Sequence, residues 1–173
     1  MPVSFRLLLV ILIAGGLAVL LWQYQSAATP VAEPVVQSIT TTPRSYYEPL
    51  LPWTLGGQTV YASMATTDET RALGLSYTSA LPKDIVKIFV FATDERWPFW
   101  MKGMEYPIDI IWVTATGTIA HIETNVSPDT YPNSFTPPTP SRYVIETVPG
   151  LFAELGLEGG DNLDMMAIIE KNN

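Results

Sequence analysis

The hydrophobic positions of the chain fall into two unlike regions. Every residue from Leu7 to Trp22 is apolar or Gly, and Arg6 precedes this run. A positive charge before such a run is typical of a membrane anchor or of a signal-peptide core. Because no further Lys or Arg occurs before Arg44, the cytoplasmic bias of positive charge predicts an N-terminus inside and the remaining chain outside.

Residues 1–25 are therefore predicted to form a signal anchor, an apolar helix that holds a single-pass protein on the cell membrane. The alternative is a signal peptide cleaved at the small residues Ser26, Ala27 and Ala28, which would leave a secreted or periplasmic domain. Residues 26–49 are rich in Pro, Thr and Ser without a hydrophobic period, so we expect a flexible linker. The folded domain is expected over residues 50–173.

Beyond residue 50, apolar positions recur in short runs that are separated by turn residues. The pair Gly56-Gly57 predicts a two-residue turn of a hairpin, because glycine tolerates the positive φ angles of such turns. The runs predicted as strands are Trp53–Leu55, Gln58–Ala65, Val86–Phe91, Ile108–Val113, Ile119–Asn125, Arg142–Val148 and Leu163–Ile169.

Two short helices are predicted between these strands. One spans residues 67–73, because Thr66 with Glu69 three positions later is a capping-box pattern and Gly74 supplies a stop. The other begins at Pro149. Together the elements predict a mainly β fold, a compact sandwich or barrel-like domain with two short helices, and an α+β open sheet is the alternative.

A proline-rich segment, residues 125–141, interrupts the strands. A loop of more than a dozen residues within a compact domain is uncommon and usually serves as a lid, a binding loop or a packed Ω-loop. Its prolines restrict the backbone, so we expect this segment to be stiff and extended.

Charge and composition exclude several classes of function. The formal net charge of -8 and the pI near 4.5 oppose binding to phosphate backbones, so nucleic acid is not an expected partner. The chain has no Cys, and its one histidine, His121, together with Glu123 supplies too few ligands for a zinc site. No metal and no cofactor are predicted, and no nucleotide-binding or hydrolase motif supports a specific enzyme.

Charged residues stand inside an aromatic, Met-rich stretch that runs from Trp97 to Trp112. Such a stretch normally buries its side chains, and a charge among them must be paired, hydrogen-bonded or directed at a solvated pocket. Lys102, Glu105 and Asp109 therefore mark this stretch as the candidate site. Its Trp residues are interpreted as core or, alternatively, as a stacking surface for sugars or peptides.

Short motifs recur in a fixed order between Gln58 and Met166. They are Gly74-Leu75, Phe89–Phe91, Phe99–Lys102, Pro107–Ile111, Gly117, the proline-rich segment, Val144–Glu146, Pro149-Gly150 and Gly160-Asp161. In this order and spacing the chain resembles the domain-of-unknown-function family 192. The resemblance implies a small, mainly β domain, often behind a signal or anchor, with no established biochemical activity. The residues that match family motif positions, and are the predicted ligand-binding residues, are Arg71, Trp100, Met101, Lys102, Asp109 and Glu146.

The chain departs from the family pattern at two places. Ser76 stands where the family usually has Met after Gly-Leu, and Gly103-Met104 stands where it often has Asn-Thr after Met-Lys. If these positions line a site, the site of this chain is altered.

Asp109 and Glu146 are carboxylates within apolar strands, where a buried carboxylate needs a partner or takes up a proton. Arg71 and Lys102 are the candidate partners. Three interpretations stay open: a structural ion pair or backbone-bonded carboxylate, a ligand-binding pocket, and a glycosidase-like acid and base.

The sequence thus favours a membrane-tethered, extracytoplasmic module that binds a small molecule, a saccharide or an envelope protein. A hydrolase of envelope saccharides that uses Asp109 and Glu146 is one alternative, and a purely structural envelope protein is another. Carboxylates that face one cleft would favour the hydrolase, whereas burial against Arg71 would favour the structural role.

Overall fold

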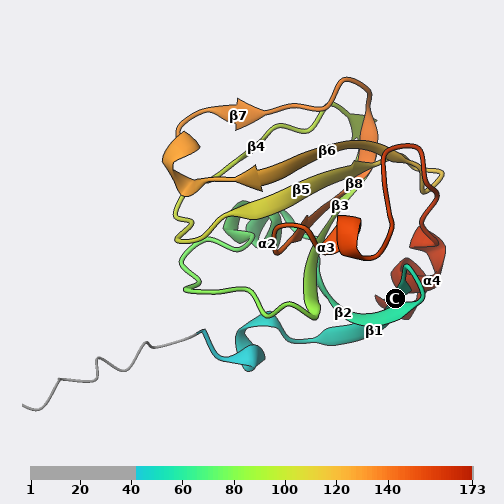
Figure 1. Cartoon of the computed structure of the whole chain (residues 1–173), viewed down its shortest axis with the longest axis horizontal. Helices are drawn as coiled ribbons and strands as arrows, with labels where there is room; N and C mark the ends of the chain where they lie inside the picture. The colour runs from blue at the N-terminus through green and yellow to red at the C-terminus, as the bar shows by residue number, and fades with distance from the viewer. Residues whose placement is uncertain (1–41, 173) are drawn as a thin grey trace, which may run out of the picture. The chain divides into compact units, whose positions relative to one another are not determined.

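The computed structural model of the protein describes residues 42–172, and Figure 1 shows its strands and helices in chain order. The apolar run Leu7–Trp22 and the first part of the predicted linker lie outside the described residues. Within residues 42–172, no helix is both long and apolar enough to cross a membrane. The membrane anchor and its orientation therefore stay predictions from the sequence.

Six strands form one mixed sheet with the order β1-β2-β3-β8-β5-β6 (Figure 1). They are β1 Leu50–Leu55, β2 Gln58–Ala65, β3 Ile85–Glu95, β5 Ile108–Val113, β6 Ile119–Val126 and β8 Ser141–Thr147. Strands β2 and β3 run parallel, and the other neighbours run antiparallel. Because β1 and β6 stand at opposite ends of this order, the sheet does not close into a barrel. The predicted mainly β fold is confirmed.

A second, two-stranded sheet joins β4, Phe99–Trp100, to β7, Ser134–Phe135. Strand β7 and the 3-10 helix η2, Pro128–Thr130, both belong to the proline-rich segment. This pairing holds the proline-rich segment against the aromatic stretch that the sequence marked as the candidate site. The segment is thus a packed connection with some regular structure of its own.

The predicted hairpin and the first predicted helix are confirmed. Leu55 pairs with Gln58 across Gly56 and Gly57, whose φ angles are 55° and 77°. Helix α2, Asp68–Leu73, connects the parallel strands β2 and β3. Its capping box is formed by the side chains of Thr67 and Thr70, one residue later than predicted, because Thr67 is the residue with extended backbone at the N-cap.

The second predicted helix is α3, Leu151–Glu154, whereas the predicted last strand is wrong. Residues Met165–Ile169 form helix α4, and the 3-10 helix η3, Glu170–Asn172, follows it. The Asp164 side chain caps α4 by accepting a hydrogen bond from the backbone N–H of Ala167 at 3.0 Å. Met165 and Ile168 are buried three positions apart, which is a helical spacing that the apolar run concealed.

The folded part of the chain begins before Leu50, within the range assigned to the linker. Thr42 exchanges hydrogen bonds with Ser79: each backbone N–H donates to the other's hydroxyl, at 2.8 and 2.7 Å. The 3-10 helix η1, Arg44–Tyr47, places Tyr47 in the core at 1 % exposure. Its hydroxyl donates to the carbonyl of Ala80. Residues 42–49 are therefore part of the fold, because an aromatic ring among them is buried.

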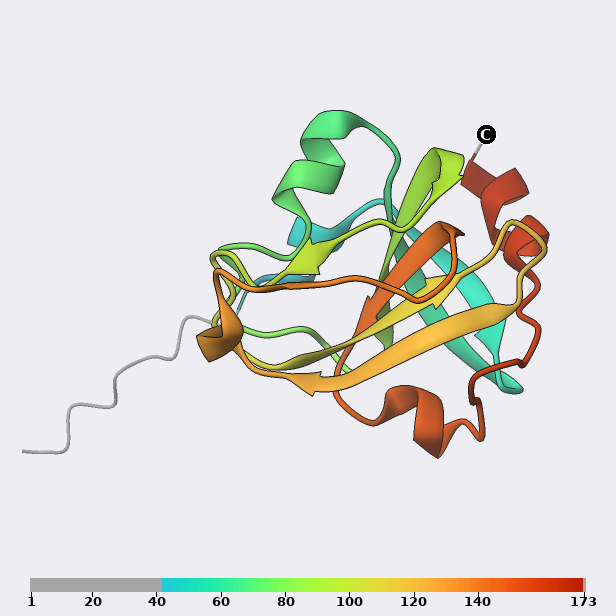
Figure 2. The same cartoon turned by 90° about the horizontal axis from the view of Figure 1, so that it is seen from above.

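The main sheet buries apolar side chains on both faces, since successive residues of a strand point to opposite sides. On one face, Phe152 of α3 and Ile168 of α4 pack against strand residues such as Ile145, and we call this cluster the helical core. On the other face, Phe89 and Met101 belong to a cluster that we call the aromatic core. In Figure 2 the green helix α2 and the orange-red helix α3 lie on opposite sides of the sheet.

Candidate functional site

A cavity of about 300 Å³ opens on the face of the main sheet that carries the aromatic core. The C-terminal end of α2, strand β3 and the residues around β4 form its walls. Three of the predicted site residues, Arg71, Trp100 and Glu146, line this cavity, which we call the aromatic pocket. The other side chains used below are Ser76, Phe89, Phe91, Trp97, Phe99 and Met104.

Glu146 lies in β8, the strand between β3 and β5, and reaches the pocket from the sheet. The residue is 5 % exposed, and its Oε2 atom is buried without a hydrogen-bond partner among the described residues. Burial raises the pKa of the Glu146 carboxyl to about 8, and the charge of Lys87 only partly opposes this shift. At neutral pH the carboxyl is therefore mainly protonated, which spares the protein a buried, unpaired negative charge.

Lys87 stands directly opposite Glu146 in the neighbouring strand β3, so both side chains leave the same face of the sheet. Its ammonium group donates to the Ser63 hydroxyl of β2 at 3.1 Å. Burial lowers the pKa of Lys87, and the carboxyl of Glu146 opposes that change. Ser63, Lys87 and Glu146 thus form a polar row across three strands behind an apolar pocket.

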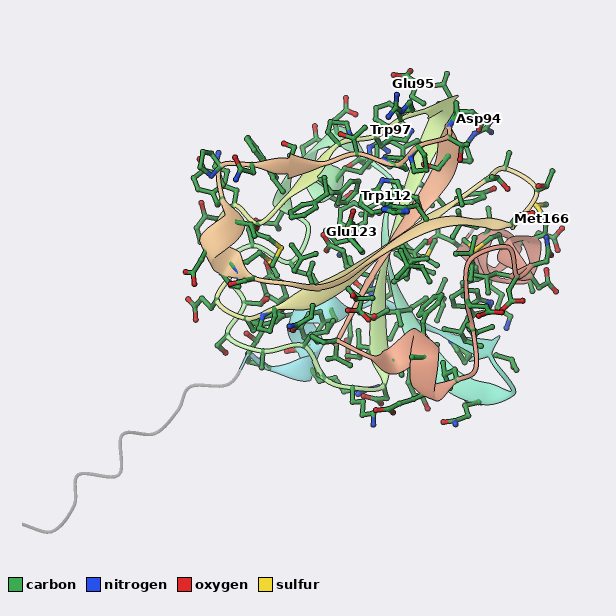
Figure 3. The ribbon with its side chains drawn as sticks, turned by 45° about the horizontal axis from the view of Figure 1, so that its top comes forward. Asp94, Glu95, Trp97, Trp112, Glu123 and Met166 are labelled. Carbon is green, nitrogen blue, oxygen red and sulfur yellow. The ribbon has the colours of Figure 1, made fainter. Side chains whose placement is uncertain are left out.

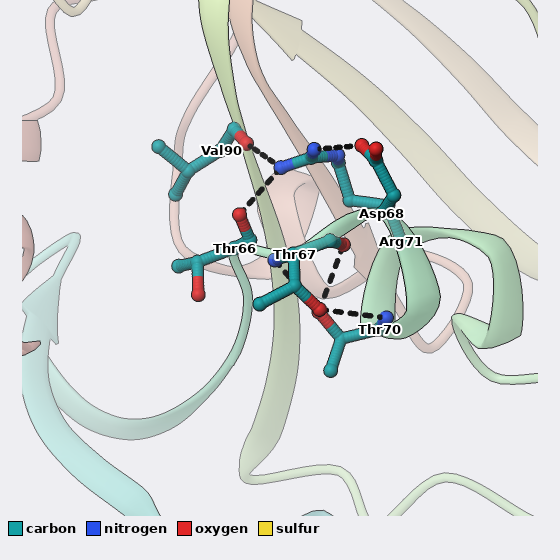
Figure 4. Close-up of polar contacts among 6 residues, drawn as sticks. All are labelled: Thr66, Thr67, Asp68, Thr70, Arg71 and Val90. Carbon is teal, nitrogen blue, oxygen red and sulfur yellow. Dashed lines mark hydrogen bonds and ion pairs between the residues drawn. The ribbon is translucent and has the colours of Figure 1, made fainter.

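Arg71 fixes helix α2 to the sheet at the edge of the pocket (Figure 4). One guanidinium nitrogen donates to the backbone carbonyls of Thr66, at 2.6 Å, and Val90, at 2.8 Å. The other terminal nitrogen pairs with the carboxylate of Asp68 at 2.5 Å. The guanidinium also lies 5.4 Å from the ring centre of Phe91. Neither predicted carboxylate partner contacts Arg71, so that pairing is wrong.

Aromatic rings form most of the remaining wall. Phe91 and Trp97 stack with their ring centres 4.0 Å apart and their planes at 11°. Phe99 meets Phe89 edge to face at 4.8 Å. Trp97 and Trp112 lie close together in Figure 3, and the indole N–H of Trp112 donates to the Trp97 carbonyl at 2.9 Å. Trp112 itself is fully buried core, so only part of the predicted aromatic stretch reaches the pocket.

The rim of the pocket holds Trp100, which is 50 % exposed. Its ring lies 5.7 Å from that of Tyr131 in the proline-rich segment, and the Lys102 ammonium lies 5.5 Å from the Trp100 ring centre. Lys102 does not line the cavity, and its carbonyl accepts a hydrogen bond from the Ser76 hydroxyl at 2.7 Å. Met101 is buried in the aromatic core at 1 % exposure.

Asp109 lies on the opposite face of the sheet from Glu146. Its carboxylate accepts hydrogen bonds from the backbone N–H groups of Asn125, at 2.7 Å, and Gly150, at 2.8 Å. Arg71 and Lys102 are therefore not the partners of Asp109, because its donors are backbone groups from later parts of the chain. Asp109 lines a separate depression of about 610 Å³, together with Gly150 and His121.

His121 and Glu123 share a contact rather than a recognisable metal site. The imidazole Nε2 and a Glu123 carboxylate oxygen are 2.9 Å apart. Across residues 42–172, no group of three or more His, Cys, Asp or Glu side chains is placed to hold a metal ion.

The sequence profile of the family DUF192, described as an uncharacterized ACR, matches residues 52–165. This match covers more than half of the chain. The chain belongs to the DUF192 family. A comparison with curated proteins gave no match for this DUF192 chain.

Two crystal structures share the fold of this DUF192 protein. A protein of unknown function from Novosphingobium aromaticivorans is 26% identical, with a TM-score of 0.61, over 80% of this chain and 94% of its own. A protein from Sinorhizobium meliloti, described as a candidate transcription regulator, is 27% identical, with a TM-score of 0.58, over 66% of this chain and 90% of its own.

Each of the two departures from the DUF192 motif pattern places one residue in the lining of the aromatic pocket. Ser76 and Met104 each line it. Gly103, which precedes Met104, has a φ angle of 68° and accepts a hydrogen bond from the backbone N–H of Tyr77 at 2.7 Å. The residues that differ from the pattern therefore change the lining of the pocket rather than a remote surface.

Sequence reasoning missed Lys87 and the two phenylalanines of β3, Phe89 and Phe91. All three were assigned to an apolar central strand, and the signal that could have found the site was the charge of Lys87 within that run. Of the predicted site residues, Arg71, Trp100 and Glu146 come together, whereas Met101, Lys102 and Asp109 do not line the pocket.

Proposed function

We propose that this DUF192 protein binds a small molecule in the aromatic pocket. The observation that carries the proposal is the Glu146 carboxyl, which is buried at a cavity wall with one oxygen unpaired. A buried polar atom without a partner costs about 1 to 3 kcal/mol, so folds rarely keep one without a use. A ligand group that enters the pocket would supply the missing hydrogen bond.

A purely structural role for Glu146 is less well supported. A structural carboxylate is normally satisfied, as Asp109 is by two backbone N–H groups. The nearest cation in register with Glu146, Lys87, donates to Ser63 instead. Sites commonly hold polar groups at a cost to stability, and the arrangement at Glu146 has this character.

The alternative of a two-carboxylate hydrolase is disfavoured by the register of β5 and β8. Asp109 pairs with Thr147, and Ile110 pairs with Glu146, so the two carboxylates leave opposite faces of the sheet. A glycosidase needs both carboxyl groups on one cleft, flanking the same bond. Asp109 and Glu146 line different cavities.

We also propose that the N-terminal segment tethers this binding domain to the outer side of the cell membrane. Arg6 and the apolar run Leu7–Trp22 support this location. Protease added to intact cells is expected to remove the domain. Full protection of the domain in unbroken cells, with digestion after lysis, would place it inside and overturn the tethering.

A thermal-shift screen of the full chain against a broad library of small molecules tests the binding function. Ligands that bind the native state raise its melting temperature by mass action. Compounds that stabilise the wild type should lose most of their effect on Glu146→Leu, which removes the carboxyl but keeps an apolar side chain of similar size. The control is Glu123→Leu, a carboxylate of the same sheet that does not line the pocket.

The control variant should keep the thermal shifts of the wild type. A library without any stabilising compound, or shifts that persist in Glu146→Leu, would contradict the proposed binding site.

A further inference from the structure

The basic side chains around the aromatic pocket are either paired or directed away from the cavity. The Arg71 guanidinium is paired with the Asp68 carboxylate. Lys87 stands opposite Glu146 in register, but its ammonium group donates to the Ser63 hydroxyl and does not line the cavity. Lys102 lies over the ring of Trp100 and does not line the cavity. A ligand with a full charge would therefore lose its hydration without meeting an uncompensated opposite charge.

Few polar side chains of the pocket wall are available to a ligand. Among the side chains that line it, Arg71, Ser76 and Glu146 are polar, and Trp97 and Trp100 each add one indole N–H donor. Arg71 is engaged with two backbone carbonyls and Asp68, and the Ser76 hydroxyl donates to the Lys102 carbonyl. The Oε2 atom of Glu146 is thus the buried polar side-chain atom of the wall for which the described residues offer no partner.

Because the pocket wall offers few hydrogen-bond partners, it favours an aromatic ring over a saccharide ring as the ligand. A saccharide carries a hydroxyl on almost every carbon, and each hydroxyl that is buried without a partner weakens binding. An aromatic ring needs no such partners and packs well against other rings, offset or edge to face. The walls offer such surfaces, because Phe89, Phe91, Trp97 and Phe99 all line the cavity. The cavity of about 300 Å³ is at the small end of ligand pockets, which suits a single ring.

We infer that the ligand is a small uncharged aromatic compound with one group that both donates and accepts a hydrogen bond, such as an alcohol or a primary amide. This inference rests on the proposed function and names the ligand class of the same pocket. The polar group meets Glu146 at the sheet, and the ring packs among Phe89, Trp97 and Phe99.

Five probes of similar size test the ligand class by titration into the full chain, followed by protein NMR. Benzyl alcohol and benzamide are neutral, benzoate is an anion, benzylamine is a cation, and methyl glucoside is a saccharide. The two neutral aromatic probes are expected to bind at least about tenfold more tightly than each of the other three, since a tenfold ratio needs only one well-made polar contact.

Variants of Glu146 add a readout that distinguishes a neutral from a charged partner. Glu146→Gln keeps a donor and an acceptor without charge, so it should bind the neutral probes within about threefold of wild type. Glu146→Leu should weaken them at least about tenfold. Glu123→Gln is the matched control and should change nothing, because Glu123 does not line the pocket.

If benzylamine, benzoate or the glucoside binds more tightly than the neutral aromatic probes, and this binding is lost in Glu146→Leu, the ligand class is wrong. The proposed binding function would still stand. Failure of all five probes would also overturn the class, and the library screen decides separately whether the pocket binds any small molecule. If the neutral probes still bind to Glu146→Leu with wild-type affinity, Glu146 has no role in the proposed binding site or in the choice of ligand.

Discussion

Two buried carboxylates in neighbouring strands, Asp109 and Glu146, are accommodated in opposite ways. Asp109 is satisfied by the backbone N–H groups of Asn125 and Gly150, whereas Glu146 has no such donors and is kept neutral by burial. The sequence indicates both as carboxylates within strands, but it does not give their partners. Those partners come from segments far away in the chain, which strand alternation cannot locate.

The protonation of Glu146 makes the stability of the protein depend on pH. Its pKa is about 8 in the folded protein and near 4.5 in the unfolded chain, so between these values the folded state holds a proton that the unfolded state has lost. The contribution of Glu146 to stability is therefore fully present below about pH 4.5 and is lost as the pH rises through 8. Since one pH unit corresponds to about 1.4 kcal/mol, the whole loss is about 5 kcal/mol, of which about 4 kcal/mol falls between pH 5 and pH 8.5.

Urea unfolding at pH 5 and pH 8.5 measures this loss as a difference between wild type and Glu146→Gln. Relative to wild type, the variant should gain stability as the pH rises, because it has no proton to lose. Glu105→Gln, at an exposed position, serves as the control for other titrating groups. A constant difference between wild type and Glu146→Gln at the two pH values would contradict the protonation of Glu146.

Asp109 is predicted to support the fold rather than ligand binding. Asp109→Asn leaves one acceptor for two backbone donors and turns an amide N–H₂ toward one of them, so we expect a loss of about 2 kcal/mol in the free energy of unfolding. Denaturant unfolding measures the loss, and exposed Asp129→Asn should stay within about 0.5 kcal/mol of wild type. Because Asp109 lies on the other face of the sheet, a probe should bind the aromatic pocket of Asp109→Asn with wild-type affinity. A lower affinity in this variant would show that the two sites are not separate.

At the scale of elements, helix α2 depends on polar clamps because none of its residues is buried. A capping box between Thr67 and Thr70 starts the helix, and Arg71 joins it to the carbonyl of Thr66, directly after β2, and to that of Val90 in β3. The cap could be predicted from the sequence because it is local. The clamp to Val90 could not, because it depends on how the helix lies on the sheet.

Arg71→Lys tests this clamp. A lysine ammonium cannot reproduce the planar fork that spans two carbonyls and a carboxylate, so we expect a loss of about 1 to 2 kcal/mol and faster amide exchange within α2. The matched control is Arg142→Lys, where a partly exposed guanidinium contacts the Asp94 carboxylate, and its effect should be within about 0.5 kcal/mol. Equal effects of the two substitutions would show that Arg71 is an ordinary surface charge.

The two helices that follow β8 show why element prediction succeeded at one place and failed at another. The start of α3 could be predicted because the turn residues Pro149 and Gly150 precede it. For α4, the apolar run Leu163–Ile169 fits a strand as well as a helix, and periodicity alone does not separate the two over so few residues. The cap by Asp164 decides for the helix.

At the scale of the whole molecule, the sequence indicated a mainly β domain but placed its start too late. The composition before Tyr46 is that of a linker, and composition does not reveal that one ring within it, Tyr47, fills a place in the core. Likewise the candidate stretch Trp97–Trp112 contained Trp97 and Trp100 of the pocket, whereas the pocket wall from β3 was hidden within a strand that looked like uniform core.

Tyr47→Ala in the full chain should lower the free energy of unfolding by about 3 kcal/mol, as expected when a buried aromatic side chain is removed. Its neighbour Tyr46 is 42 % exposed, so Tyr46→Ala should cost less than about 1 kcal/mol. Guanidinium unfolding curves of the two variants give the comparison. If Tyr47→Ala is as mild as Tyr46→Ala, residues 42–49 are dispensable to the fold.

The position of β8 in the sheet determines when the sheet can be completed. It is the last strand in the chain, yet it lies between β3 and β5, whose only link within the sheet order is through it. A chain still emerging from the ribosome or from an export channel therefore holds two separate sheet fragments with open inner edges until residues 141–147 arrive. The domain must fold late, after nearly all of it has been delivered, and shortened chains that end before Ser141 would present those edges to other molecules instead of burying them.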